Sequence, residues 1–150
     1  MKNDDITEGW LPEGGDDFSP KKVGLLGELN VQHELLTQGF NIYSPLCDDD
    51  QVDLVVETDY GFKKVQTKTI TKMPRGTSIE IRLQKYINTG RVDVVAVHFL
   101  PRKITAFYPY NNERDIILAL HSSKNGQEKD RNWFYRYERF PIIKTKDHNG

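Results

Sequence analysis

The segment DLVVETDYGFKKVQTK, residues 53–68, predicts a β-hairpin, and we describe the other expected elements by their position before or after it. Asp53 begins an apolar strand, a turn is centred near Tyr60, and the chain returns through Gln66 and Lys68. In that register Asp53 faces the stretch from Gln66 to Lys68, whose end residues share one face because they are two positions apart. A carboxylate, an amide oxygen and an ammonium would then meet on one patch of sheet. Such a patch suits a hard divalent cation beside a phosphate.

A helix is expected before the hairpin, from Ser19 to about Gln38. Ser19 is a typical N-cap, Pro20 suits the first helical position, and Gly39 suits the end of the helix. The apolar stripe of this helix is expected to consist of Leu25, Leu26, Leu29, Leu35 and Leu36. At a period of 3.6 residues, Glu28 falls on the edge of that stripe.

The rest of the pattern predicts a small α/β or α+β domain. Residues 92–99 are the clearest buried strand, and residues 78–86 suit a strand, a helix or both in succession. Further strands are expected over residues 40–43, 104–108 and 133–140, and a short helix over residues 112–120 with Ile116, Ile117 and Leu120 turned inward.

Length and composition suit one globular domain of 150 residues. We expect an irregular N-terminal arm over 1–18, a core over 19–120 and a C-terminal extension over 121–150. Cys47 is the only cysteine, so a disulfide within the chain is impossible and a reducing cytoplasm is expected. No apolar run approaches the length of a membrane span, and the acidic N-terminus does not suit a signal peptide.

The net charge of -1 hides an uneven distribution. The first 20 residues are acidic, whereas residues 60–91 carry many basic side chains and Glu80 as the one acid, and the tail from Lys124 is again basic. A localised basic face suits a polyanionic partner. Ordinary solvated surface is the more common explanation of such charge taken by itself.

Four side chains are candidates for a functional site: Glu28, Asp53, Gln66 and Lys68. Each has a structural alternative. Glu28 at the helix border would reach solvent or pair with a lysine, and Asp53 would mark the start of its strand. Gln66 and Lys68 would lie on the solvated side of a sheet. Their predicted convergence favours the functional interpretation.

Together these residues resemble the motif of the PD-(D/E)XK nuclease superfamily. The match consists of Glu28 on a helix, Asp53 on a strand, and Gln66-Thr67-Lys68 where the family has (D/E)-x-K. It extends over roughly residues 19–120 and implies a nuclease-like core, in which a mixed sheet is flanked by helices. Two positions depart from the motif, because Gln66 replaces the usual acid and valine replaces the usual proline before Asp53.

Within the superfamily, the chain resembles homing endonucleases encoded in group I introns of cyanobacteria. This resemblance implies site-specific hydrolysis of double-stranded DNA by a homo-oligomer, either a dimer or a tetramer, with Mg²⁺ or alternatively Mn²⁺. Asp53 would bind the metal together with the Gln66 side-chain oxygen and the Thr67 carbonyl, and Glu28 would bind it directly or through water. Lys68 would orient the attacking water and offset the charge of the transition state.

Contacts with DNA are expected from the basic middle of the chain, with Lys72, Arg75, Arg82 and Lys85 as candidates. Ordinary surface charge is the alternative for each of them. The aromatic run over residues 133–137 would stack on nucleic acid or, more commonly, form core or a subunit interface.

Two other functions remain open. A Holliday-junction resolvase or a restriction-type nuclease would share this fold and differ in its loops. A non-catalytic DNA-binding protein on a decayed nuclease fold is favoured by Gln66 and disfavoured by the retention of Glu28, Asp53 and Lys68. The histidines lack metal-ligand spacing with Cys47, which argues against a zinc site, and His98 is expected to be structural.

Overall fold

The computed structural model describes residues 19–47, 51–122 and 130–144. The expected N-terminal arm lies outside this range, as does part of the expected C-terminal extension. The elements are α2 (Pro20–Thr37), β1 (Asn41–Tyr43), β2 (Leu54–Thr58), β3 (Gly61–Ile70), β4 (Ser78–Arg82), β5 (Val94–Phe99), β6 (Ile104–Pro109) and β7 (Asp115–Ala119), with 3₁₀ turns η2 (Gln84–Tyr86), η3 (Leu100–Arg102) and η4 (Phe134–Tyr137). None of the described helices has both the length and the apolar character needed to cross a membrane.

Five strands form a mixed sheet in the order β1-β2-β3-β5-β6. Strands β3 and β5 are parallel, and the other neighbours are antiparallel. The predicted hairpin is confirmed, because Leu54 pairs with Val65 and Thr58 pairs with Gly61 about a turn at Tyr60. The predicted α/β class with a mixed sheet is therefore correct.

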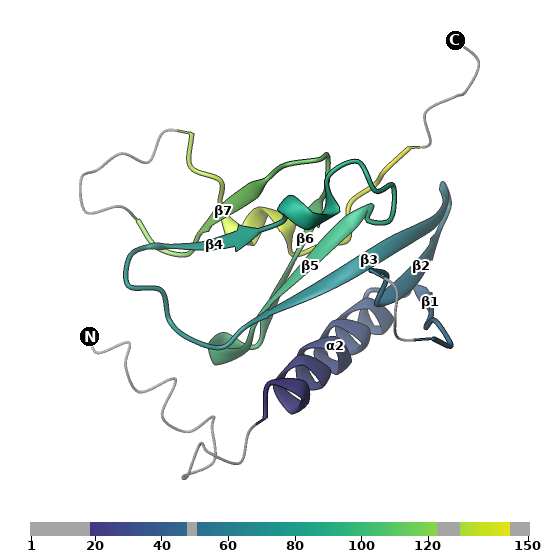
Figure 1. Cartoon of the computed structure of the whole chain (residues 1–150), viewed down its shortest axis with the longest axis horizontal. Coiled ribbons are helices and arrows are strands. Elements are labelled where there is room, and N and C mark those ends of the chain that lie inside the picture. Colours follow the sequence, from purple (N-terminus) through teal and green to yellow (C-terminus); the bar gives the residue numbers. More distant parts are fainter. Residues whose placement is uncertain (1–18, 48–50, 123–129, 145–150) are drawn as a thin grey trace.

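Two different layers cover the two faces of this sheet (Figure 1). Helix α2 packs on one face, where Val31 and Leu35 join Val65 in a buried cluster. The strands β4 and β7 form a second, two-stranded sheet over the other face, and they share a larger buried cluster with β5. A small sheet thus occupies the layer where the resemblance implied a second helix.

The buried face of α2 differs from the expected leucine stripe. Gly27, Val31 and Leu35 are buried, whereas Leu25, Leu29 and Leu36 are between 52% and 58% exposed. The reason is a close approach at Gly27, where an added Cβ would lie 1.8 Å from Thr69 Oγ1 on β3. Only glycine allows this contact, so it fixes which side of the helix meets the sheet.

Two further expectations were wrong. The predicted helix over residues 112–120 is the strand β7, because Ile116 and Leu118 are buried while Ile117 is exposed, which is the two-residue period of a strand. The predicted strand over residues 133–140 contains the 3₁₀ turn η4, whose Phe134 is buried in the core. Residues 78–86 form a strand followed by a turn, which was one of the alternatives.

The contact at Gly27 leads to a prediction about stability. Replacement Gly27→Ala forces Cβ against Thr69 and should lower the free energy of unfolding by about 1–3 kcal/mol, measured by urea denaturation. The matched control is Gly24→Ala in the same helix, where an added Cβ meets nothing within 4 Å. This control should stabilise the protein by about 0.5–1 kcal/mol. Equal stabilities for the two variants would contradict the assigned contact.

Candidate active site

The candidate site lies where the Asp53 side chain forms a hydrogen bond with the backbone of β3. The ladder between β2 and β3 ends where Asp53 N donates to Val65 O at 2.9 Å. At the next position along the ladder the acceptor is the Asp53 carboxylate and not a backbone oxygen, because Thr67 N donates to Asp53 Oδ2 at 2.8 Å. The sequence-based expectation that Asp53 faces the stretch from Gln66 to Lys68 is confirmed.

Beyond this bond, β3 has a strand neighbour on one side only within the described residues. It continues to Ile70 and pairs with β5 there, while its pairing with β2 stops at Val65. The N–H and C=O of one strand residue point toward the same side of the strand. Since the Thr67 N–H points toward Asp53, the Thr67 carbonyl also points to this open edge, where it accepts a long hydrogen bond of 3.5 Å from Gln66 Nε2.

The side-chain oxygen of Gln66 completes a set of oxygen donors beside this edge. Gln66 Oε1 is buried and has no hydrogen-bond partner among the described residues. A buried amide oxygen without a partner costs about 1–3 kcal/mol, so a ligand at this place would remove a real penalty. The Asp53 carboxylate, Gln66 Oε1 and the Thr67 carbonyl are all hard oxygen donors, and they fit a divalent cation such as Mg²⁺.

The charge of this donor set is low. In the part of the chain that the structure describes, no three His, Cys, Asp or Glu side chains are grouped closely enough to hold a metal ion. Gln66 therefore stands as a neutral donor where a second carboxylate would raise cation affinity. Asp53 supplies a full negative charge at this edge.

Lys68 is held by an aromatic ring that was not among the candidate site residues. Its Nζ lies 4.9 Å from the centre of the Tyr86 ring, and Lys85 Nζ lies 5.2 Å from the same ring. Tyr86 is 2% exposed and packs edge-to-face on Tyr110. A cation over a buried ring is electrostatically favourable, so Tyr86 positions the Lys68 ammonium. Sequence spacing gave little signal, because the contact depends on how η2 folds over β3.

Glu28 approaches the same strand from the other layer. It lines a cavity of about 430 Å³ together with Thr67, Lys68 and Thr69. Thr69 faces Gly27 of α2, whereas the Lys68 ammonium lies at Tyr86 on the opposite face of β3. The structure thus brings Glu28 to the strand that carries Lys68, and the two residues line one cavity.

The four expected DNA contacts are all exposed. Lys72 and Arg75 lie in the loop between β3 and β4, and Arg82 ends β4. Lys85 lies in η2, and its ammonium shares the Tyr86 ring with Lys68. The side chains are accessible, as contacts with DNA require.

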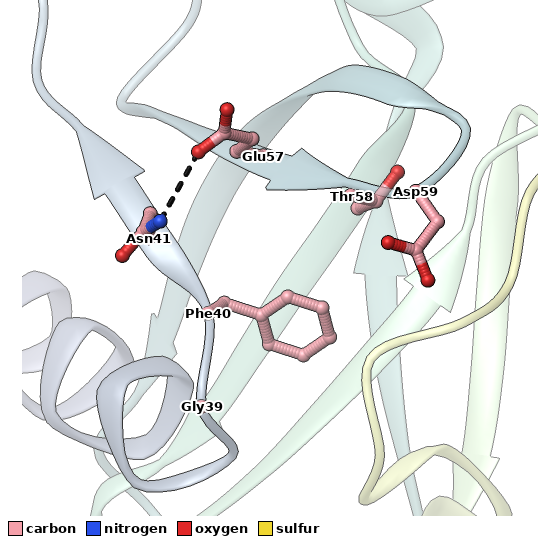
Figure 2. Close-up of a pocket in the computed structure, with 6 residues that line it drawn as sticks. All are labelled: Gly39, Phe40, Asn41, Glu57, Thr58 and Asp59. Atoms are coloured by element: carbon pink, nitrogen blue, oxygen red, sulfur yellow. Dashed lines mark hydrogen bonds between the residues drawn. The ribbon is translucent and has the colours of Figure 1, made fainter.

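A second cavity lies away from these residues and is shown in Figure 2. It has a volume of about 540 Å³ and is lined by Gly39, Phe40, Asn41, Glu57, Thr58 and Asp59. Asn41 Nδ2 and the Tyr43 hydroxyl both donate to Glu57 Oε2, at 3.2 and 3.3 Å. None of the candidate site residues lines it, so cavity size alone does not mark the site.

His98 is buried in the sheet, in agreement with the expected interior position. Its Nδ1 lies 2.9 Å from Thr105 Oγ1, and burial lowers the pKa of His98 to about 4. The ring is consequently neutral near pH 7. It lies outside the cavity that Glu28 lines.

The family model described as PD-(D/E)XK endonuclease matches residues 18–139, which include every candidate site residue. No curated protein sequence matches the chain.

Two solved structures are similar to the described fold. One is a bacterial homing endonuclease, I-Ssp6803I, with 19% identity, a TM-score of 0.57 and coverage of 79% of this chain and 86% of that chain. The other is Hjc, a Holliday junction resolvase from the archaeal hyperthermophile Archaeoglobus fulgidus, with 17% identity, a TM-score of 0.42 and coverage of 64% and 83%. The first likeness supports the fold.

The oxygen donor set predicts how the site responds to charge. Replacement Gln66→Glu buries a carboxylate and should lower the free energy of unfolding by about 1–3 kcal/mol in EDTA. Addition of Mn²⁺ should restore this stability and bind more tightly than in the wild type, as measured by thermal unfolding and calorimetry. The control is Gln84→Glu at an exposed glutamine of η2, which should change neither quantity. If Mn²⁺ stabilised both variants equally, the assigned donor set would be wrong.

Proposed function

This chain belongs to the PD-(D/E)XK endonuclease family, and we propose that it hydrolyses double-stranded DNA at specific sites with a divalent metal ion. The observation that carries the proposal is the hydrogen bond from Thr67 N to Asp53 Oδ2, which fixes the carboxylate beside Gln66 and Lys68. Homing is the proposed biological role, because the whole chain resembles intron-encoded homing endonucleases. The proposed location is the cytoplasm, which suits the exposed thiol of Cys47.

The proposed metal ligands are Asp53, the Gln66 side-chain oxygen and the Thr67 carbonyl, with Glu28 contributing directly or through water. Mg²⁺ is the proposed ion, with Mn²⁺ as an alternative. When bound, such an ion supplies a Lewis acid for the phosphoryl oxygens and lowers the pKa of a bound water. The role of the chain is to hold the oxygen donors at one end of a strand ladder.

Lys68 acts on the phosphate rather than on the metal in this proposal. Its ammonium orients the attacking water and offsets the negative charge that develops on the phosphoryl oxygens. The buried Tyr86 ring keeps the flexible side chain in place, so less entropy is lost when the substrate binds. Lys85, on the same ring, adds positive charge next to the site.

DNA is proposed to approach along the exposed basic residues Lys72, Arg75, Arg82 and Lys85. Two of them lie in the loop that directly follows the site strand β3, which supports a role in contacts near the scissile phosphate. Arg75 stands between Pro74 and Gly76 and is the candidate for reaching a base edge.

A second copy of the chain is the proposed partner. Leu25, Leu29 and Leu36 are exposed on the outward face of α2, and with Gln32 they follow the 4-3-4 spacing of a coiled-coil seam. Such a seam is self-complementary, so α2 of one copy can pack on α2 of another about a two-fold axis. A dimer, or a tetramer built from dimers, would supply one site for each DNA strand.

Cleavage assays test the assigned roles. In Mg²⁺ with linear duplex DNA, Asp53→Ala and Lys68→Ala should each lower the cleavage rate by at least about 100-fold, while binding of the duplex survives. Near wild-type cleavage by either variant would overturn the assignment. A wild-type protein that binds but cuts no substrate would favour the non-catalytic alternative, and a preference for four-way junctions would favour a resolvase.

Two controls separate chemistry from structure in that assay. Asp93 Oδ2 accepts a hydrogen bond from Lys64 N at 2.8 Å on the other edge of β3, which is the same backbone role that Asp53 has toward Thr67. Replacement Asp93→Ala should therefore cost similar stability but leave cleavage by the folded protein in place. Lys144→Ala removes an exposed lysine that lies over the Tyr60 ring, away from the site, and serves as the charge control.

The proposed α2 interface makes a separate prediction. Replacement Leu29→Glu puts a charge in the seam and should convert the oligomer to a monomer in sedimentation velocity experiments. Ile117→Glu on β7 is the matched control, because Ile117 is 57% exposed and lies outside the seam. A wild-type protein that is monomeric at micromolar concentration would refute this interface.

A further inference from the structure

Two arginines from distant parts of the chain converge on His121. Arg102, the last residue of η3, places Nη2 at 3.2 Å from His121 Nε2. Arg131, which precedes η4, donates from Nη2 to the His121 backbone oxygen at 2.9 Å. Arg102 also donates from Nη1 to the Tyr135 hydroxyl at 3.2 Å. We refer to Arg102, His121 and Arg131 as the arginine cluster.

In the part of the chain that the structure describes, no hydrogen-bonded carboxylate offsets the positive charge of the arginine cluster. Within the described residues, the hydrogen bonds of both guanidinium groups go to hydroxyl groups, a backbone oxygen and an imidazole, and none goes to a carboxylate. Arg131 Nε is buried without a hydrogen-bond partner among the described residues, and the Arg131 guanidinium lies over the Trp133 ring at 5.3 Å from its centre. Two guanidinium groups that bond to one histidine bring positive charge to the same residue, which would attract an anion.

His121 adds no further positive charge near neutral pH. Burial, and then the neighbouring Arg102, lower the pKa of His121. Since an arginine only donates, Nε2 must accept the Arg102 hydrogen bond, which leaves the imidazole proton on Nδ1. The histidine thus holds Arg102 in place as a neutral acceptor.

The arginine cluster is joined to the basic loop that follows the site strand. Arg131 Nη2 also donates to Thr77 Oγ1 at 2.9 Å and to Ser78 Oγ at 3.2 Å, at the end of the loop that carries Lys72 and Arg75. On the other side, η3 begins directly after β5, whose Phe99 pairs with Ile70 at the end of β3. The arginine cluster therefore lies at the end of the sheet toward which β3 runs beyond Lys68.

We propose that Arg102 and Arg131 form a second phosphate-binding site, which takes a backbone phosphodiester of duplex DNA at some distance from the scissile phosphate. Guanidinium groups are the side chains best suited to this ligand, because their planar donors match phosphate oxygens. Arg102 and Arg131 are partly exposed and Tyr135 is 41% exposed, so a phosphate can approach these residues. A purely structural role accounts for the hydrogen bonds of Arg131. It does not explain why Arg102 is charged, because a hydroxyl group and a neutral imidazole can be bonded by an uncharged donor. The inference rests on the proposed function in taking DNA as the source of the phosphate.

The salt dependence of DNA binding tests this site. Binding of a duplex of arbitrary sequence is measured by fluorescence anisotropy in EDTA, so that neither a metal ion nor cleavage contributes. Replacement Arg102→Gln should weaken binding several-fold at low salt and reduce the slope of log affinity against log salt by about 1, the loss of one phosphate contact. The matched control is Arg139→Gln at an exposed arginine beside Phe140, which should keep the wild-type slope. A wild-type slope for Arg102→Gln would overturn the proposal.

Two further measurements exclude an indirect effect on folding. Tyr135→Phe removes one hydrogen bond of Arg102 but keeps its charge, and its salt slope should equal that of the wild type. In the unaltered protein, the pKa of His121 measured by NMR should rise when duplex DNA saturates the site, because a phosphate offsets the charges of Arg102 and Arg131. A His121 pKa that stays unchanged at saturation would also overturn the proposal.

The outcome is separable from that of the proposed function. A protein that binds duplex DNA through Arg102 but cuts no DNA in Mg²⁺ would retain this phosphate site and refute the endonuclease. If the wild-type protein cuts DNA but Arg102→Gln binds DNA with the wild-type salt slope, the endonuclease is supported and this phosphate site is refuted.

Discussion

The hydrogen bond from Thr67 N to Asp53 Oδ2 is the constraint on which the site depends. In this bond a carboxylate takes the place of a backbone acceptor. The pairing of β2 with β3 therefore ends here, and the edge of β3 beyond it has no strand neighbour among the described residues. The same bond fixes the carboxylate next to Gln66 and aims the Thr67 carbonyl into the opened space. Asp53 thus ends the strand pairing and also supplies the negative charge of the candidate site. The alternation of side chains along β3 then determines the face on which Lys68 lies.

A second constraint comes from the other layer. The contact between Gly27 and Thr69 sets the rotation of α2 on the sheet. That rotation turns Glu28 toward β3, and it leaves Leu25, Leu29 and Leu36 facing outward. One glycine thus determines both the access of an acid to the site strand and the surface that a second copy is proposed to cover.

Local patterns predicted the hairpin, its register and the place of Asp53 opposite Gln66, because a short turn and strict alternation leave little choice. The same patterns failed where tertiary packing decides. A hydrophobicity stripe weighs leucines and neglects glycine, so it predicted the burial of Leu35 correctly but also assigned the exposed Leu25, Leu29 and Leu36 to the buried face. The isoleucines before Leu118 suit a helix or a strand equally until β4 is present as a pairing partner. The contact of Lys68 with Tyr86 and the meeting of Arg102 with Arg131 depend on distant segments folding together, which no spacing within one segment reveals.

The neutral side chain of Gln66 has a consequence for the order of events in catalysis. Because Gln66 replaces an acid, the proposed donor set carries one negative charge fewer, so a bound cation would keep more of its positive charge and would attract a phosphate more strongly. Metal and nucleic acid are then thermodynamically linked, and each raises the affinity of the other by the same factor. Such reciprocity would keep the metal centre largely unassembled until a duplex arrives. Under the proposed function, this property of the Gln66 amide would limit cleavage in the absence of a bound duplex.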